Sequence, residues 1–209
     1  EIYLKNLFYA LRQVYGKEVK LYLLMPAGVQ NARSYAISIE ADDMVQYNVP
    51  QRWTPLWLAN GILKRALLRD VLMEKPLKDC QMNILFGSTL TYRCPKVAVL
   101  SWLPDFQHVH LPGMFSKVEC ASRDKTFLRC AKVATRIVLM SEAVKKDFES
   151  FAPMYAYKAR VLNPVSYVPQ SIYERDLNSI VEMYHLPEKF VYLPNQFWKH
   201  KNHELVFQA

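Results

Sequence analysis

The sequence predicts an α/β fold built on a parallel sheet, because short β-rich runs alternate with longer helical stretches. Four short runs are rich in β-favouring residues, at residues 82–86, 96–102, 136–140 and 159–162. Helical patterns fill two of the gaps between them, at residues 120–134 and 142–151. Such alternation is typical of parallel βαβ units. Right-handed crossovers then stack helices on both faces of one sheet, as in a Rossmann domain.

The chain opens with an amphipathic helix. Residues 1–15 place apolar side chains at helical spacing on one face, namely Leu4, Leu7, Phe8, Leu11 and Val14. We expect a buried strand at residues 19–25. A doubly wound fold normally has a strand before its first helix, whereas this sequence begins with the helix. Residues 27–49 show little periodicity, so we expect a loop with one strand at residues 35–39.

A second helix is predicted at residues 55–73. Its core side carries Leu56, Leu63, Leu67 and Val71, and its flank combines two tryptophans with basic side chains, namely Trp53, Trp57, Lys64, Arg65 and Arg69. An aromatic and basic flank can dock on an anionic lipid surface. A solvated basic face with two tryptophans at the edge of the core is the commoner explanation.

Composition indicates an ordinary globular protein with anionic partners. The 209 residues carry a formal net charge of +8, and 51% of them are hydrophobic. Nucleic acid, an acidic membrane face and a nucleotide-sugar diphosphate are all anionic partners of this kind. No apolar run approaches the ~20 residues that a membrane-spanning helix needs. The four cysteines are scattered (Cys80, Cys94, Cys120 and Cys130), which favours reduced core thiols in a cytosolic protein over disulfides or a zinc site.

Two prolines mark a domain boundary. Pro164 and Pro169 bracket a short connecting segment. We therefore expect one α/β domain at residues 1–166, and a linker with the first part of a second domain at residues 167–209. That remainder, which includes a helix at residues 173–184, is close to the limit of ~40 residues below which domains seldom fold alone, so we expect the second domain to be truncated or disordered beyond it.

The last stretch, FVYLPNQFWKHKNHELVFQA (residues 190–209), has the pattern of a phosphate site. An apolar run at residues 190–193 predicts a strand, a basic loop with Lys199, His200 and Lys201 follows, and a helix begins with Asn202 as its N-cap. The free N–H groups and the positive dipole end of such a helix, together with a lysine, suit a bound phosphate.

A second candidate stretch, SWLPDFQHVHLPGMFS (residues 101–116), follows a predicted strand directly. It therefore lies at the carboxyl edge of the sheet, where open α/β folds bind ligands. Asp105, His108 and His110 crowd into this loop. On spacing alone, a turn-capping aspartate with two surface histidines is equally consistent with the pattern.

Both stretches resemble segments of the retaining glycosyltransferases of family 4, which have the two-domain GT-B architecture. The last stretch is similar to the start of their donor-side domain, and Lys201 falls on the lysine that receives the donor diphosphate. Asn195 and Gln196 stand where the family usually has a Gly-Arg pair. The resemblance thus implies a donor-phosphate site with Lys201, Asn195, Gln196 and Asn202.

The loop resembles the family segment Asp-x-Gln-His-x-His-x-Pro-x-x-Phe-Ser, which faces the cleft where sugar and acceptor meet. The matching residues are Asp105, Gln107, His108, His110, Pro112, Phe115 and Ser116. The resemblance implies that His108 and Asp105 are catalytic. It places His110, Gln107 and Ser141, the last in a strand-turn-helix segment also similar to the family, on the acceptor side.

The resemblance implies transfer of a sugar from a nucleotide-diphosphate sugar to an acceptor hydroxyl, on a glycan or lipid-linked glycan in cell-surface polysaccharide synthesis. It implies no metal and no other cofactor. His185, His200 and His203 lack a carboxylate or cysteine at ligand spacing, so we predict no metal site. We expect a cytoplasmic protein with peripheral contact at the inner membrane face, no nucleic-acid partner, and no activity from residues 1–209 alone.

Three alternatives remain. One is a degenerate, non-catalytic GT-B homologue, suggested by Asn195, Gln196 and Pro104, the last at a place where many relatives carry histidine. Another is a basic α/β module that binds nucleic acid through stacking aromatics. The third is a GT-B relative with different chemistry, such as epimerisation of a nucleotide sugar.

Overall fold

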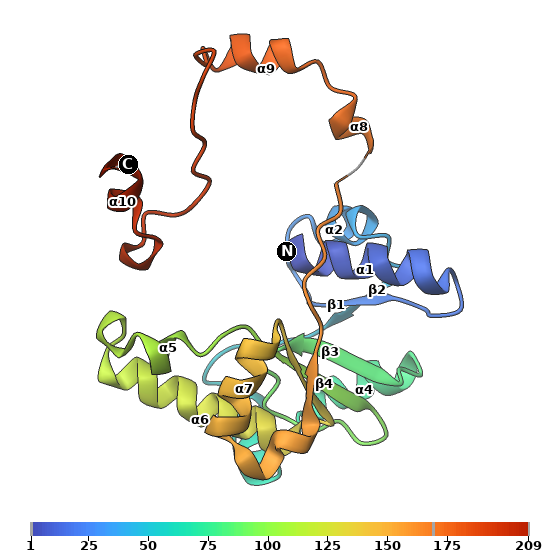
Figure 1. The fold of residues 1–209 in the computed structure, drawn as a ribbon. Helices are drawn as coiled ribbons and strands as arrows, with labels where there is room; N and C mark the ends of the chain where they lie inside the picture. Colours follow the sequence, from blue (N-terminus) through green and yellow to red (C-terminus); the bar gives the residue numbers. More distant parts are fainter. Residues whose placement is uncertain (1, 169, 209) are drawn as a thin grey trace. The chain divides into compact units, whose positions relative to one another are not determined.

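The computed structural model describes residues 2–168 and 170–208, and its fold is α/β with parallel sheets, as predicted (Figure 1). The chain divides into two compact units, Glu1–Tyr167 and Val168–Ala209. Every strand in the described residues belongs to the first unit, which has the alternating parallel strands and helices of a Rossmann-like domain.

The strands form two sheets where the sequence predicted one. β1 (Tyr22–Pro26) pairs with β2 (Asp43–Tyr47). β3 (Ile84–Ser88), β4 (Ala98–Leu103), β5 (Arg136–Leu139) and β6 (Ala159–Val161) form the second sheet in that order. All four pairings are parallel. The four strands predicted between residues 82 and 162 are therefore confirmed, with ends shifted by one or two residues.

Helices cover both faces of the larger sheet. On one face, α4 (Val71–Asp79), α6 (Lys117–Val133) and α7 (Glu142–Phe151) contribute Leu77, Phe127 and Phe148 to a buried core with Val99 and Leu103 of β4. Successive side chains of a strand point to opposite faces, so Trp102 points away from this core. There Tyr3 of α1 (Ile2–Tyr15) stacks on the Trp102 ring at 4.8 Å. Thus α1 lies on the face opposite α6.

The smaller sheet has its own apolar cluster with α1 and α2 (Ala32–Ser38). Phe8 of α1 and Ala36 of α2 pack with Leu23 of β1. The far end of α1 is outside this cluster, since Val14 is 71% exposed. The predicted apolar face of the first helix is therefore only partly buried.

Residues 27–49 differ from the prediction. The expected strand at residues 35–39 lies within α2 and its C-terminal end, and β2 was not foreseen. Ala32, Ala36 and Ile39 are the buried residues there, at the i, i+4, i+7 spacing of a helix. This helical spacing of the buried residues outweighs the β-propensity of Tyr35 and Ile37. The β-propensity of a residue reflects its side-chain packing more than an intrinsic preference of its backbone.

The single helix predicted at residues 55–73 is two helices, α3 (Pro55–Ala66) and α4. Leu68 breaks the run with a left-handed backbone (φ 53°), a conformation that ends a helix. Leu56 and Leu67, assigned to the core, are 55% and 53% exposed. The buried residue of α3 is Asn60, because it faces the buried Asp70 at the start of α4.

The second unit contains short helices and no strand within its described residues. The helix predicted at residues 173–184 is divided into α8 (Gln170–Tyr173) and α9 (Leu177–Met183), and α10 (His203–Gln208) closes the chain. The strand predicted at residues 190–193 is wrong, and Val191 and Tyr192 there are 83% and 77% exposed. An apolar run forms a strand only against a paired neighbour, and the unit offers none.

Candidate functional site

The loop at residues 104–116 leaves the carboxyl end of β4 and is held at both ends. It contains α5 (Gln107–His110) and a 3₁₀ turn, Pro112–Met114. At its start, Asp105 Oδ1 accepts a hydrogen bond from the Gln107 backbone N–H at 3.1 Å. At its end, Ser116 caps α6 in a reciprocal capping box with Glu119, with bonds of 3.2 and 2.8 Å.

Three acid–base pairs fasten this loop to the helices behind it. Asp105 Oδ1 lies 2.7 Å from Arg123 Nη2. His108 Nε2 lies 3.0 Å from Asp124 Oδ1. His110 Nε2 lies 2.9 Å from Asp147 Oδ1. The first two pairs reach α6 and the third reaches α7, so we call these three pairs the loop tethers.

His108 is the buried member of the tethers. Its side chain is 1% exposed and lies among aromatic rings, with centroid distances of 5.4 Å to Phe127, 6.1 Å to Phe106 and 6.5 Å to Phe115. Its Nδ1 is buried without a hydrogen-bond partner among the described residues. In this conformation the ring supports the loop and does not reach solvent. Its predicted catalytic role stays a prediction.

The accessible carboxyl and imidazole groups of the tethers are Asp105, Asp124, His110 and Asp147. Their side chains are 36%, 46%, 59% and 28% exposed. Carboxyl ends of parallel strands meet at one edge of a sheet, and the loop continues directly from such an end. A carboxylate held by a guanidinium and an imidazole held by a carboxylate can there bind a hydroxyl and accept its proton.

Arg123 joins the aromatic cluster to the first tether. Its guanidinium lies 5.2 Å from the Phe115 ring centroid and 5.6 Å from that of Phe127. Both distances are within cation–π range. The same side chain therefore orients Asp105 and packs on the rings around His108.

Ser141 lies at the next strand end. It follows β5 and caps α7, since its Oγ accepts a hydrogen bond from the Val144 backbone N–H at 3.3 Å. Its capping role is thus established, whereas its predicted contact with an acceptor stays a prediction, as does that of Gln107 at the start of α5.

The predicted phosphate residues lie in the second unit. Lys201 is exposed at the end of the 3₁₀ turn Lys199–Lys201. Gln196 Oε1 accepts a hydrogen bond from Trp198 Nε1 at 2.6 Å, and Asn195 is exposed. Asn202 has a left-handed backbone (φ 50°, ψ 48°), outside the extended region of an N-cap. The helix begins directly after Asn202, at His203, as predicted, whereas the strand that was to lead into this loop is not formed.

Three further features concern metal ligands, thiols and the length of the helices. Across residues 2–168 and 170–208, no cluster of three or more His, Cys, Asp or Glu side chains could hold a metal ion. All four cysteines are free, as predicted, and Cys94 and Cys130 are buried. Within the same residues, each helix is too short or too polar to cross a bilayer.

Sequence reasoning missed the partners of the tethers. Asp124 lies on the helix that directly follows the loop and Asp147 lies on the next helix, and nothing in their local pattern identifies their contacts. It also missed a buried polar centre in which Lys64 Nζ lies 2.5 Å from Asp70 Oδ2 and Asn60 Nδ2 lies 3.4 Å from Asp70 Oδ1. The available indication was Asp70 itself, a charged residue two positions after the helix break at Leu68, because such a residue can cap the next helix.

No protein-family model matches the chain, and no curated protein was found to be similar to it.

Proposed function

We propose that this protein is a retaining glycosyltransferase of GT-B architecture. In the proposal it transfers a sugar from a nucleotide-diphosphate donor to an acceptor hydroxyl on a glycan or lipid-linked glycan. The observation that carries the proposal is the loop at residues 104–116. It combines the motif DFQHVHLPGMFS with a position at the carboxyl end of a parallel strand, where α/β folds bind substrates.

The tethers give this loop a chemistry suited to an acceptor. Asp105 is oriented by Arg123 and by the Gln107 N–H, and a carboxylate held in this way can accept a hydrogen bond from a sugar hydroxyl. In the proposed reaction the bond from the anomeric carbon to the diphosphate oxygen breaks, and a bond to the acceptor oxygen forms. The acceptor hydroxyl loses its proton, and His110 beside Asp147 is the accessible group able to take it.

We assign His108 a positioning role in this scheme. Its buried ring joins Asp124 to the aromatic cluster, so its loss would displace the loop that carries Asp105 and His110. The donor diphosphate gains negative charge as it leaves. Lys201 is assigned to that charge, because a cation stabilises the transition state more than the less negatively charged ground state.

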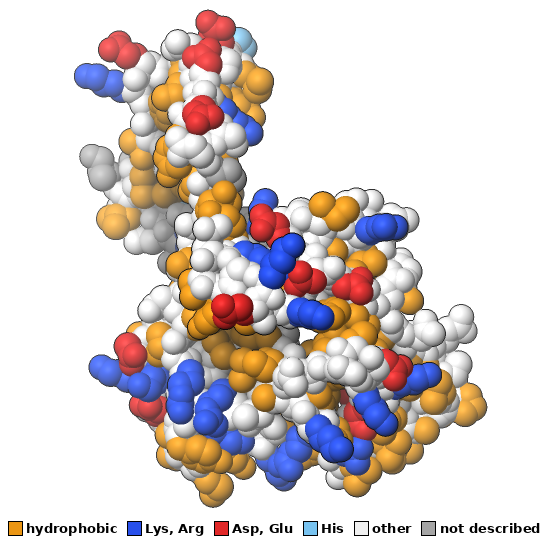
Figure 2. Space-filling model, turned by 90° about the vertical axis from the view of Figure 1, so that its right-hand side faces the viewer, with side chains coloured by type: hydrophobic (Ala, Val, Ile, Leu, Met, Phe, Trp, Pro, Cys, Tyr) orange, Lys and Arg blue, Asp and Glu red, His pale blue; other side chains and the backbone are white. Residues whose placement is uncertain are grey.

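The nucleic-acid alternative is less well supported. A continuous basic stripe is the usual footprint of such proteins. On the face that Figure 2 shows, lysine and arginine side chains of the first unit are interspersed with acidic and apolar ones. In addition, Lys64, Arg69 and Arg123 are neutralised by carboxylates. Membrane contact through the flank of α3 stays a prediction. The Trp53 side chain of this flank is 70% exposed.

The test uses the complete gene product with a panel of nucleotide-diphosphate sugars and glycan acceptors. Release of nucleoside diphosphate is measured for Lys201→Ala and for Lys199→Ala, its neighbour in the same exposed turn. We expect Lys201→Ala to weaken donor binding about tenfold or more, and Lys199→Ala to change it less than about twofold.

Each outcome decides one part of the proposal. Unchanged donor affinity in Lys201→Ala refutes the phosphate assignment. Donor turnover without an acceptor favours epimerisation. Salt-sensitive oligonucleotide binding with no response to any nucleotide sugar refutes the transferase itself. Comparison of kcat for His110→Gln and His108→Gln separates the roles, since only a substrate-facing base shifts the pH profile of kcat.

A further inference from the structure

The α3 helix has apolar side chains on its exposed side and polar ones on its buried side. Asn60 is 7% exposed, whereas Leu58 and Ile62 are 46% and 65% exposed. Leu58, Ile62 and Ala66 recur at the i, i+4 spacing that places side chains on one side of a helix. A surface helix normally has the opposite arrangement. We call this exposed side the outer face of α3, and its residues are Pro55, Leu58, Ala59, Ile62, Arg65 and Ala66.

Polar contacts on the inner side hold α3 in this orientation. Lys64 Nζ lies 2.5 Å from Asp70 Oδ2, and Asn60 Nδ2 lies 3.4 Å from Asp70 Oδ1. Arg129 Nη2 of α6 donates a hydrogen bond to the Lys64 carbonyl at 3.0 Å. Rotation of the helix to bury Ile62 would separate Lys64 from the buried Asp70, and a buried charge without its partner is strongly destabilising. The first unit therefore cannot cover the outer face by turning α3.

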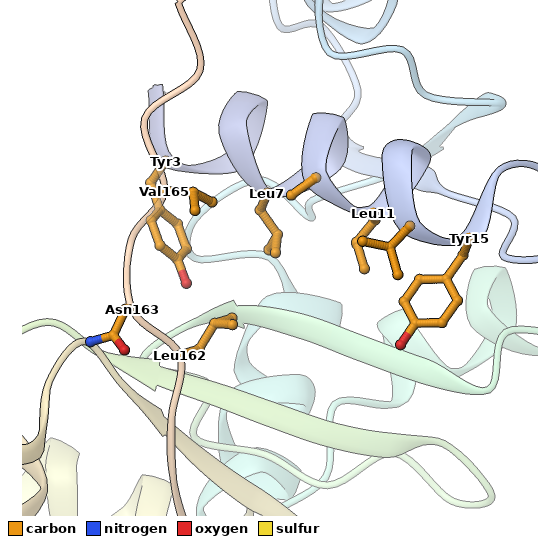
Figure 3. Close-up of a pocket in the computed structure, with 9 residues that line it drawn as sticks. Tyr3, Leu7, Leu11, Tyr15, Leu162, Asn163 and Val165 are labelled. Atoms are coloured by element: carbon orange, nitrogen blue, oxygen red, sulfur yellow. The ribbon is translucent and has the colours of Figure 1, made fainter.

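The N-terminal helix α1 shows the usual arrangement. In Figure 3, Leu7, Leu11 and Tyr15 point from α1 toward the neighbouring strands, where they line an apolar cavity of about 220 Å³. Leu162 and Val165, which follow β6, line the same cavity. These apolar side chains of α1 thus face other parts of the first unit, whereas those on the outer face of α3 face solvent.

The sequence around the outer face is basic. Residues 44–69 contain no aspartate or glutamate, and their basic residues are Arg52, Lys64, Arg65 and Arg69. Lys64 and Arg69 are paired with carboxylates. Arg52 and Arg65 are exposed, and no ion pair joins either of them in the part of the chain that the structure describes. Their charges are therefore available to an anionic partner.

An exposed tryptophan lies directly before α3. The Trp53 ring centroid lies 5.4 Å from that of Trp57, and the Arg52 guanidinium carbon lies 5.3 Å from the Trp53 centroid. Tryptophan is enriched where lipid headgroups meet acyl chains, and a neighbouring arginine can there keep its charge in water. Leu56 and Leu67 are 55% and 53% exposed near the two ends of the helix, so apolar surface extends along the whole of α3.

We propose that the outer face of α3 docks on an anionic phospholipid surface, with the helix axis parallel to the bilayer plane. Leu58, Ile62 and the Trp53 ring enter the boundary between headgroups and acyl chains. Arg52 and Arg65 bind the lipid phosphates. An interfacial helix combines apolar burial with attraction of basic residues to anionic lipid in this way. The inference does not rest on the proposed glycosyltransferase function.

This contact differs from the flank that the sequence indicated. Trp57, Lys64 and Arg69 of that flank are half-buried, and the two cations are paired with Asp70 and Glu74. The lipid contact therefore belongs to the outer face, whose apolar side chains the sequence pattern did not single out.

The charge of this surface favours lipid over a second copy of the chain. In a twofold symmetric dimer the same patch meets itself, so the outer faces of two copies would bring Arg65 near its counterpart. Residues 44–69 offer no carboxylate to pair with these cations. An anionic bilayer supplies both the missing negative charge and an apolar layer.

The test measures cosedimentation of the protein with vesicles of phosphatidylcholine and phosphatidylglycerol in equal parts, and with vesicles of phosphatidylcholine alone. We expect binding to the anionic vesicles to be about tenfold or more stronger, and to weaken in ~1 M salt. Brominated phosphatidylcholine in the anionic vesicles should quench tryptophan fluorescence, and Trp53→Phe should remove most of that quenching.

Two matched pairs of variants locate the contact. Ile62→Glu should weaken binding to anionic vesicles about tenfold or more, because it removes an inserted side chain and adds a repelled charge. Its control is Ile37→Glu, which adds the same charge at a 71% exposed isoleucine of α2. Arg65→Ala should weaken binding about fivefold, and its control is Arg33→Ala, at an exposed arginine of α2. Both controls should change binding less than about twofold.

Three results would overturn the proposal. The first is no binding of the protein to the anionic vesicles. The second is an equal effect of each variant and its control, which would indicate general attraction of a basic protein. The third is a dimer in sedimentation equilibrium that Ile62→Glu dissociates, which would assign the outer face to a second copy of the chain. The four substituted side chains are all exposed, and circular dichroism verifies that the variants are folded.

Discussion

The tether between Asp105 and Arg123 should be measurable as a coupling free energy. The perturbations are Asp105→Asn, Arg123→Met and both together. Asparagine keeps the acceptor for the Gln107 N–H at 3.1 Å and removes only the charge. Methionine keeps part of the volume that Arg123 packs on Phe115 and Phe127.

The expected size of the coupling free energy follows from the exposure of the Asp105 and Arg123 side chains. With side chains 29% and 36% exposed, the ion pair itself is worth about 0.5–1 kcal/mol. Two ring contacts at ~0.5–1 kcal/mol each bring the total loss in Arg123→Met to about 1.5–3 kcal/mol. Asp105→Asn should cost about 0.5–1 kcal/mol, and the coupling term should equal the ion pair alone.

Urea unfolding followed by circular dichroism supplies the four free energies of the cycle. The coupling should decrease in ~1 M salt, because partly exposed charges are screened. Strict additivity, with a coupling below ~0.2 kcal/mol at low salt, would contradict the assignment of Arg123 as the residue that orients Asp105. The same result would leave the loop dependent on its aromatic contacts.

Two further predictions concern stability. Lys158 donates from Nζ to the carbonyls of Ala131, Lys132 and Ala134 at 2.8, 3.3 and 2.8 Å. Burial lowers the pKa of Lys158 and offsets part of this gain, so Lys158→Met should lower the free energy of unfolding by about 2–4 kcal/mol. The control Lys132→Met, at an exposed position, should change the free energy of unfolding by less than about 0.5 kcal/mol. Equal effects of the two substitutions would refute the stabilising role of the Lys158 hydrogen bonds. At Asp42, burial opposes ionisation, but hydrogen bonds from Arg12 and from the Leu21 N–H outweigh it and hold the pKa below its usual range. Such a carboxylate stabilises the fold above its unfolded pKa of ~3.9 and loses this effect as pH falls through the lower folded value. The urea concentration at the unfolding midpoint should therefore decrease as the pH is lowered from about 5 to about 2. The decrease should be smaller in Asp42→Asn than in the control Glu18→Gln, and equal dependence of the midpoint on pH in the two variants would contradict the assignment.

Sequence alone predicted best where local pattern and packing agree. The strands that became β4, β5 and β6 are short runs rich in β-favouring residues, and Ser141 and the residues of α7 form a complete cap-and-helix pattern. Residues 190–193 were misread because an apolar run specifies a strand only when a neighbour supplies hydrogen bonds. The break at Leu68 was missed because a left-handed leucine is unusual, and only the cap at Asp70 indicates it.

The site shows the same division between local and non-local information. Asp105 was correctly identified as a residue of a strand end, and its turn-capping bond to Gln107 is local. Burial of His108 depends on Phe127 and Asp124, which approach only when α6 packs on the sheet. Spacing could therefore nominate the two histidines of the loop but not decide which one remains accessible.

The first turn of α1 and the loop after β4 are physically connected through one aromatic pair. Trp102 is the penultimate residue of β4, and the loop begins two residues later. Its ring is stacked by Tyr3, so the first turn of α1 already rests on the strand that carries the site. We therefore expect that loss of this stack in Tyr3→Ala speeds amide exchange in residues 104–116. Exchange at the His108 and His110 amides that stays unchanged in Tyr3→Ala would show that the loop is held by its tethers alone.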